Sequence, residues 1–149
     1  MSVYTFALMN VCGVDLDKNE ARLVVMAARA GGFELVDTEV TRLGLSDPKD
    51  QGEVRALMAA LQSFFDDNLI DVVAIRERLS KGRMKGGTIT FKLEGLIQLC
   101  RQPVTLISPA SIRKSLAAAN IDFAELPIAK YQHEAYGAAY CMIQMQPSE

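Results

Sequence analysis

Histidine and cysteine, which build many metal and nucleophilic sites, are scarce: the 149 residues include three cysteines, one histidine and no tryptophan. Cys12, Cys100 and Cys141 stand far apart and form neither a Cys-x-x-Cys pair nor a Cys/His zinc pattern. This spacing argues against structural zinc and a disulfide scaffold, and it is typical of buried thiols in a cytoplasmic protein. The single His133 offers no catalytic Ser/His/Asp or Cys/His arrangement, and helical spacing predicts that it is exposed.

Long hydrophobic runs are also missing. No apolar segment approaches the roughly 18 residues that cross a membrane, and the chain does not open with the charged and hydrophobic regions of a signal peptide. We therefore expect a cytoplasmic protein without a membrane span. The length predicts one domain over residues 1–149, with a core at about 9–145. The net charge of −2 argues against non-specific coating of nucleic acid but is compatible with a local basic patch.

The first third of the chain predicts a three-stranded antiparallel meander. The strands are expected at residues 9–16, 21–28 and 33–43. In the first of these, Val11, Gly13 and Asp15 share one face, so that Asp15 lies at the carboxyl end of the strand. Gly31-Gly32 predicts a tight turn before the third strand, whose interleaved charges are typical of a half-exposed edge.

The rest of the chain alternates between helices and strands. Asp47 before Pro48 fits an N-cap with proline at the first helical position, which predicts a helix ending at Asp67-Asn68. A strand, a helix, a strand and two helices follow, at residues 69–75, 88–100, 103–107, 108–120 and from Pro127 to about 145. The order predicts an α/β fold with a mixed five-stranded sheet, a meander plus parallel strands, flanked by helices on both faces.

The segment that follows the predicted strand 69–75 carries a strong local charge asymmetry. The strand delivers Arg76, Glu77 and Arg78 to its carboxyl end, where ligands collect in open α/β sheets. The candidate phosphate- or nucleic-acid-binding residues of this region are Arg76, Arg78, Lys81, Arg83, Lys85 and Lys92. The alternative is a solvated basic loop, or one that pairs with acidic residues of a partner subunit.

Two features next to this loop bear on the same question. Gly86-Gly87-Thr88 begins a predicted helix, where backbone N–H groups and the helix dipole favour an anion. These glycines match neither the Walker nor the dinucleotide-binding fingerprint, so we do not expect a nucleotide pocket of those kinds. Arg113-Lys114, on a later helix, either extends the basic surface or is simply solvated.

The final predicted helix places a carboxylate on an apolar stripe. At 100° per residue, Glu134 shares a stripe with Tyr131, Ala135 and several later apolar residues. A buried carboxylate must be paired, protonated or bound to a metal. Glu134 either pairs with an arginine where the helix meets the sheet, or joins Asp15 and Glu77 around magnesium or manganese. A second apolar stripe predicts burial on both sides or a homodimer through this helix: Tyr136, Tyr140 and Ile143.

These motifs in this order resemble the ribonuclease H-like superfamily, and their layout resembles the RuvC-type Holliday-junction resolvases. The resemblance spans about residues 9–145. It rests on a meander whose first strand ends in Asp15, a strand reaching Ala74-Ile75, and the late segment Glu134-Ala135-Tyr136-Gly137-Ala138-Ala139. More narrowly, Val11-Cys12-Gly13-Val14-Asp15 and the stretch over residues 75–94 resemble an uncharacterised bacterial family, domain of unknown function three-thousand-and-ten.

The resemblance to the resolvases implies a carboxylate metal site, and this chain departs from it at two positions. Asp15 matches their first metal-binding Asp, and Glu134 matches the final acid of their late helix. Their second carboxylate follows the Ala-Ile pair, where this chain has Arg76, and their remaining acid corresponds to Tyr131. Glu77 comes one residue after Arg76, so it can substitute only where the strand ends or bulges.

Two functions follow, and a third is disfavoured. In a metal-dependent nuclease, Asp15, Glu77 and Glu134 would hold magnesium or manganese while the basic loop 76–88 positions nucleic acid. In a catalytically degenerate binding module, Arg76 has replaced a metal ligand and the loop binds nucleic acid or phosphate without hydrolysis. A sugar-kinase/actin-like phosphotransferase is disfavoured, because the turn after Asp15 lacks the glycine of a phosphate-binding turn.

Overall fold

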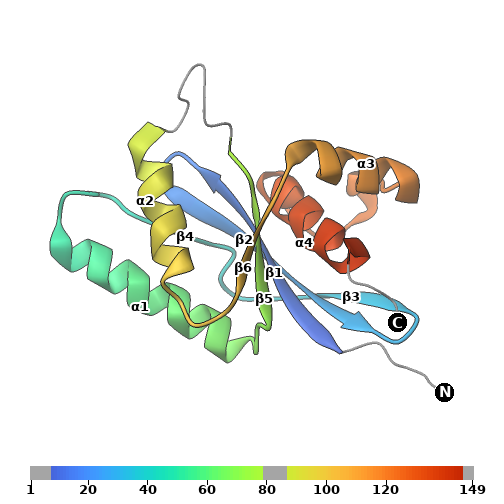
Figure 1. The fold of residues 1–149 in the computed structure, drawn as a ribbon, viewed down its shortest axis with the longest axis horizontal. Helices are drawn as coiled ribbons and strands as arrows, with labels where there is room; N and C mark the ends of the chain where they lie inside the picture. The colour runs from blue at the N-terminus through green and yellow to red at the C-terminus, as the bar shows by residue number, and fades with distance from the viewer. Residues whose placement is uncertain (1–7, 79–86, 146–149) are drawn as a thin grey trace.

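The computed structural model of the chain describes residues 8–78 and 87–145. Within these residues the strands are β1 (Met9–Asp17), β2 (Glu20–Arg29), β3 (Gly32–Val36), β4 (Arg42–Gly44), β5 (Val72–Arg76) and β6 (Val104–Ile107). The helices are α1 (Gln51–Asp67), α2 (Gly87–Gln98), α3 (Pro109–Ala119) and α4 (His133–Met145), with the short 3₁₀ helices η1 (Phe123–Glu125) and η2 (Lys130–Gln132) before α4. Figure 1 shows one sheet with helices on both sides.

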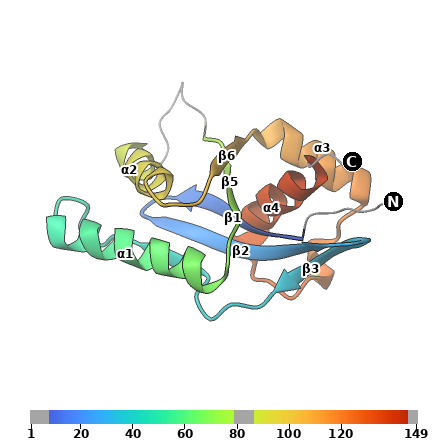
Figure 2. The same cartoon turned by 60° about the horizontal axis from the view of Figure 1, so that its bottom comes forward.

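The sheet is mixed and has β1 at its centre. The order is β3-β2-β1-β5-β6, and β4 pairs with β2. β1 is antiparallel to β2 and parallel to β5, which is in turn parallel to β6. Figure 2 shows β3 continuing the sheet beyond β2. The predicted α/β class, with a meander followed by parallel strands and flanking helices, is therefore confirmed.

The predicted third strand is interrupted, so the sheet has six strands where five were expected. Both β3 and β4 pair with β2, but the chain between them leaves the sheet edge. Within this excursion the Thr38 hydroxyl donates to the Val40 carbonyl at 2.7 Å. The Leu23 N–H still donates to the Thr41 carbonyl at 2.9 Å. The local side-chain hydrogen bond offers the backbone an alternative to the strand ladder, which the alternation of polar and apolar residues does not reveal.

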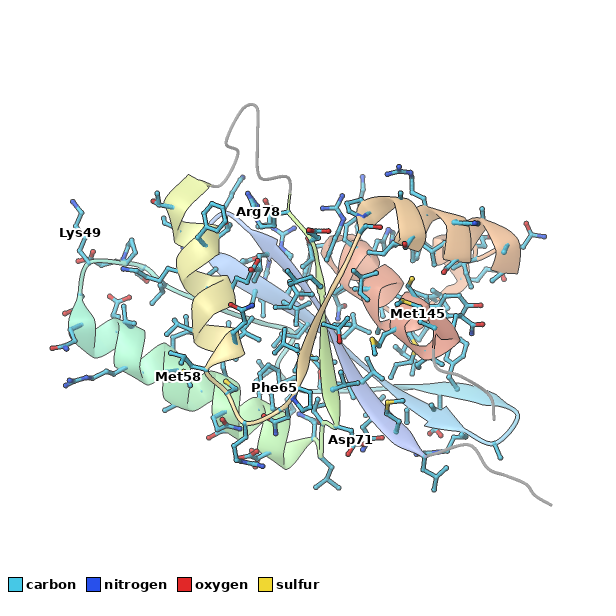
Figure 3. The ribbon with its side chains drawn as sticks, in the orientation of Figure 1. Lys49, Met58, Phe65, Asp71, Arg78 and Met145 are labelled. Carbon is cyan, nitrogen blue, oxygen red and sulfur yellow. The ribbon has the colours of Figure 1, made fainter. Side chains whose placement is uncertain are left out.

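The two faces of the sheet belong to separate hydrophobic clusters. Side chains alternate along a strand, so Cys12 and Val14 pack toward α1 and α2 while Val11 packs toward α3 and α4. Figure 1 shows the two pairs of helices on opposite sides of the sheet. In Figure 3, Phe65 of α1 lies between its helix and the strands, and it is fully buried. The predicted division of β1 into two faces is confirmed.

Two glycines let α4 pack closely on both of its sides. A Cβ added at Gly13 of β1 would meet the Ala135 carbonyl and would lie 2.8 Å from the Ala139 nitrogen. A Cβ added at Gly137 of α4 would lie 2.6 Å from Cγ2 of Ile112 in α3. α4 therefore packs closely between β1 and α3, which accounts for its two apolar stripes within one chain. A homodimer through this helix stays a prediction.

The helix boundaries agree with the sequence in α3 and differ in α1 and α4. The Ser108 hydroxyl accepts from the Ser111 N–H, and Asn120 ends α3 with φ 56° and ψ 44°, as predicted. α1 begins at Gln51 and not at Pro48, because the Asp47 carboxylate accepts from the Lys49 N–H at 3.0 Å and stabilises a turn.

The last helix also starts later than expected. The segment after Pro127 forms η2, which contains Tyr131, before α4 begins at His133. Tyr131 was predicted to share an apolar stripe with later residues of one continuous helix. That prediction is wrong for Tyr131, because this residue lies before α4 begins. Within residues 8–78 and 87–145, no helix is both long and apolar enough to cross a membrane.

Candidate functional site

A cleft lies where β1 and β5 end and α3 begins. Its volume is about 740 Å³. Figure 3 places Arg78 at this end of β5, opposite Asp71 at the other end of the strand. The residues that line the cleft are Asp15, Leu16, Asp17, Arg22, Arg76, Glu77, Arg78, Ser108, Pro109, Ala110, Arg113 and Glu134. The site therefore occupies the carboxyl end of parallel strands, where the sequence predicted it.

Pairing across the sheet surrounds one carboxylate with cations. Asp15 in β1 pairs with Arg22 in β2, and Arg22 pairs with Arg42 in β4. On the other side Val14 pairs with Ile75, so the residues that follow them, Asp15 and Arg76, lie next to each other across β1 and β5. The sheet register brings these residues together although they lie far apart in the chain.

Asp15 is buried, and its surroundings raise its pKa. Its residue surface is 8% exposed. Burial raises the pKa of the Asp15 carboxyl, and the Glu134 and Asp17 carboxylates raise it further, while the Arg76 and Arg22 guanidinium groups act to lower it. The pKa rises overall because the loss of hydration outweighs the neighbouring cations. A carboxylate held in this state at a cleft is a candidate functional group.

Arg76 forms an ion pair across the cleft with Glu134 of α4. Arg76 Nε lies 3.1 Å from Glu134 Oε1, and the side chains are 32% and 55% exposed. Arg76 Nε is itself buried and makes no hydrogen bond within residues 8–78 and 87–145, so the contact is electrostatic. The prediction that Glu134 is buried on the apolar face is wrong: α4 begins one residue earlier, and Glu134 is exposed in its first turn, where it lines the cleft. The alternative that Glu134 pairs with an arginine is confirmed.

The three predicted metal ligands line one cleft but do not form a cation site as they stand. Asp15, Glu77 and Glu134 all lie on its wall. Among the described residues, no group of three or more His, Cys, Asp or Glu side chains is arranged to hold a metal ion. Arg76 brings a guanidinium to Glu134, and this donor set does not suit a divalent cation, which prefers several oxygen ligands.

Glu77 follows Arg76 directly and lies just beyond the end of β5. Its N–H donates to the Ile107 carbonyl at 2.8 Å, so backbone pairing with β6 continues to this residue. β5 ends at Arg76, and the exposed Glu77 still reaches the cleft wall. Because β5 ends at Arg76, alternation along the strand does not separate Glu77 from the cleft.

The predicted basic residues are only partly gathered at the cleft. Arg76 and Arg78 line it. Lys92 does not, because its Nζ donates to the Pro48 carbonyl at 2.6 Å on the side of α1 and α2. The remaining predicted cations lie outside the described residues: Lys81, Arg83 and Lys85.

Sequence reasoning missed a second basic group beside the cleft. Arg22 pairs with Asp17 at 3.0 Å and with Glu20 at 2.8 Å. The Arg42 guanidinium lies 4.2 Å from the centre of the Tyr131 ring, and that of Arg22 lies 5.8 Å from it. The available signal was one arginine inside the otherwise apolar segment 21–28, which a buried strand retains only with partners.

His133 is less exposed than the sequence predicts. It is half-buried, and its ring stacks on Phe123 with centroids 4.1 Å apart and an interplanar angle of 10°. Helical periodicity alone did not reveal this contact, because Phe123 belongs to η1, outside the helix. The stacked pair lies next to the cleft, beside Glu134.

The chain has a ribonuclease H-like fold with a RuvC-like layout. Thermus thermophilus RuvC is similar with a TM-score of 0.72 and 17% identity, over 89% of this chain and 92% of that chain. Thermus thermophilus RuvC in complex with a Holliday junction substrate matches with a TM-score of 0.70 and 18% identity, over 89% and 91%. The yeast mitochondrial Holliday junction resolvase Ydc2 matches with a TM-score of 0.60 and 11% identity, over 93% and 81%. These identities establish a shared fold.

The chain belongs to the family described as "Protein of unknown function (DUF3010)", whose model matches residues 9–142. The narrower resemblance, drawn from the motif that ends in Asp15 and from residues 75–94, is thereby confirmed. No curated protein matches the chain.

Proposed function

We propose that this chain binds nucleic acid in the cleft by contacting the phosphates of the nucleic-acid backbone. The proposed binding needs no divalent metal ion. The observation that carries the proposal is the Arg76–Glu134 ion pair beside Asp15. The resemblance to the resolvases would place a carboxylate at position 76. A guanidinium there supplies the positive charge that a metal would otherwise bring to Asp15 and Glu134.

The charges of the cleft support phosphate binding. Asp17 and Glu134 are engaged by Arg22 and Arg76, which reduces their repulsion of an anion. Arg113 is exposed and makes no ion pair with any described residue, so its guanidinium is available. Guanidinium groups match phosphate oxygens in a two-pronged geometry, and neutralising phosphates provides much of nucleic-acid affinity.

Two further features fit the same ligand. Ser108, Pro109 and Ala110 at the start of α3 line the cleft, where a helix dipole favours negative charge. One similar structure is a RuvC complex with Holliday junction DNA. That likeness supports nucleic acid as the class of ligand for this chain.

The test is a fluorescence-anisotropy titration in EDTA with labelled single-stranded, duplex and four-way-junction DNA. We expect saturable binding that weakens as salt is added. Arg113→Gln should weaken it and lower the salt slope by about one, because one phosphate contact is lost. Arg101→Gln is the matched control, since Arg101 is exposed, pairs with Asp66 and does not line the cleft. Absence of binding to all three DNAs would contradict the proposal.

A metal-dependent nuclease is the competing function, because Asp15, Glu77 and Glu134 all line the cleft. Cleavage of the same DNAs is therefore measured with magnesium or manganese, for the wild type and Asp15→Asn. A calorimetric manganese titration accompanies it. Saturable manganese binding and cleavage that are both lost in Asp15→Asn would overturn metal-free binding and establish the nuclease.

A further inference from the structure

A smaller cavity opens off the cleft between α3 and α4. Its volume is about 180 Å³. The cavity and the cleft share four residues, so the two adjoin: Arg76, Pro109, Arg113 and Glu134. The rest of the cavity wall, which does not line the cleft, is formed by Ile112, Leu116, Phe123 and His133. We refer to this cavity as the side pocket.

The inner wall of the side pocket is apolar and aromatic. Ile112 is almost fully buried. The Phe123 and His133 rings are nearly parallel, with centroids 4.1 Å apart, and Phe123 also meets the Tyr136 ring edge-on at 5.7 Å. These contacts hold the aromatic pair from two directions. The pocket wall therefore combines packed aromatic rings with aliphatic side chains.

The mouth of the side pocket is polar, in contrast to its wall. Arg76 and Arg113 bring guanidinium groups to the mouth, and Glu134 brings a carboxylate. The volume is below the roughly 300–1,000 Å³ that drug-sized ligands occupy, so one ring system is the fitting size. A suitable ligand is planar, carries hydrogen-bonding groups on one edge and is attached to an anion that lies in the cleft.

We propose that the side pocket binds one unstacked nucleobase of a strand whose phosphates lie in the cleft. The inference rests on the proposed function and names the form of nucleic acid that the site takes. Bases that are splayed out of a strand stack on aromatic side chains and present their edges to polar groups. Glu134 can accept from the exocyclic amine of such a base, as acidic side chains do from cytosine.

Base pairing in a duplex would keep the bases out of this pocket. A duplex offers phosphates to Arg76 and Arg113, but its bases are stacked and paired, and extruding one of them costs free energy. The pocket therefore favours single strands and unpaired positions. Phosphate binding alone would make no such distinction.

The experiment compares a labelled oligodeoxycytidylate with an abasic strand of the same length and charge, by anisotropy in EDTA. The cytosine strand should bind about tenfold to about a hundredfold more tightly, the range expected for stacking of a base on an aromatic side chain. His133→Ala and His133→Leu should abolish this difference and leave the affinity for the abasic strand unchanged. His133→Phe keeps a flat ring and should retain the difference. Thermal unfolding of each variant shows that it is folded.

Each other outcome overturns the inference in a distinguishable way. Equal affinity for the two strands rejects the base pocket while the proposed phosphate binding stands. No binding of either strand rejects both. Duplex DNA that binds as tightly as the cytosine strand also rejects the pocket. Displacement of the strand by an equal nucleotide concentration of deoxycytidine monophosphate rejects a strand as the ligand, and with it the inference.

Discussion

The two faces of the central sheet end differently at the cleft. On the face that carries α1 and α2, Val14, Leu16 and Ile75 stay buried and apolar to the ends of β1 and β5. On the face that carries α3 and α4, the same strands carry Asp15, Asp17 and Arg76 at their ends. The difference separates two tasks: the first face contributes hydrophobic stabilisation, and the second brings charge to a cleft.

A single position along each strand separates the apolar residue from the charged one. Val14 precedes Asp15 in β1, and Ile75 precedes Arg76 in β5; because side chains alternate, each pair divides between the two faces. A shift of one residue in register would bury the charges against α1 and α2. The apolar residues of one face therefore fix the register that assembles the site on the other.

Gly13→Ala should have the largest effect, because it separates α4 from the sheet. The new Cβ would meet backbone atoms of Ala135 and Ala139, which cannot rotate away. We expect a loss of about 1–3 kcal/mol in the free energy of unfolding, typical of overpacking, and weakened binding in the cleft. Urea denaturation followed by circular dichroism measures the first effect.

Gly95→Ala in α2 is the matched control for that substitution. A Cβ at Gly95 meets nothing within 4 Å, and alanine favours a helix, so the protein should gain about 0.5–1 kcal/mol. A Gly13→Ala variant as stable as the wild type would show that α4 is not held at the distance the structure gives. The comparison of the two faces would then need revision.

Arg76→Asp should convert the charged face into a metal site. The carboxylate that this substitution introduces would converge with those of Asp15 and Glu134, and the three would repel one another unless a cation binds. We expect the manganese affinity to rise by about tenfold or more relative to the wild type. Removing a residue that supports a metal site usually lowers the metal affinity by at least about tenfold, and adding a carboxylate should have the opposite effect. Calorimetry measures the affinity, and the melting temperature of the variant should rise with manganese.

Arg76→Gln tests whether the gain comes from the added carboxylate. It removes the same positive charge without supplying an oxygen anion, so it should bind manganese less well than Arg76→Asp. Wild type and Arg76→Asp with equal manganese affinity would mean that Arg76 does not stand in for a metal ligand.

Asp15→Asn should have the smallest effect on folding, and the size of that effect depends on pH. Burial raises the pKa of Asp15 above its usual 3.8, so the folded state holds the proton more tightly than the unfolded state. Below the pKa that Asp15 has in the unfolded chain, its contribution to the free energy of unfolding is complete. This contribution is lost as the pH rises through the pKa that Asp15 has in the folded protein. Asp15→Asn should therefore raise the melting temperature at neutral pH, and the difference should shrink as the pH falls toward 4.

Asp67→Asn provides the control, because Asp67 is exposed at the end of α1 and its substitution removes the same charge. It should change the melting temperature little. An Asp15→Asn variant less stable than the wild type at neutral pH would mean that pairing with Arg76 outweighs burial. The charged face would then contribute to stability as well as to binding.

Most of the elements could be predicted because local physics determines them. The Ser108–Pro109 start and the Asn120 end of α3 follow from capping chemistry within a few residues. The two faces of β1 follow from alternation. The interrupted third strand could not be predicted, because the Thr38–Val40 hydrogen bond competes with a ladder whose strength depends on β2.

Some residues that line the cleft could be named from the sequence, but their arrangement could not. The position of Asp15 and Arg76 at strand ends was visible in the sequence. The ion pair between Arg76 and Glu134 was one of two open alternatives, because helical periodicity could not show where α4 begins relative to the sheet. Arg22 and Arg42 around Tyr131 were missed, since only pairing between strands brings them together.

The sequence by itself determined most of the strands and helices, the family and the location of charge at the carboxyl ends of β1 and β5. These properties follow from periodicity, caps and motifs that act over short distances in the chain. Only the tertiary structure decided that a guanidinium pairs with Glu134, that Asp15 is buried between cations and that an aromatic side pocket opens off the cleft. Those facts depend on burial and on distances between segments far apart in the chain, where hydration and Coulomb energies are set by packing.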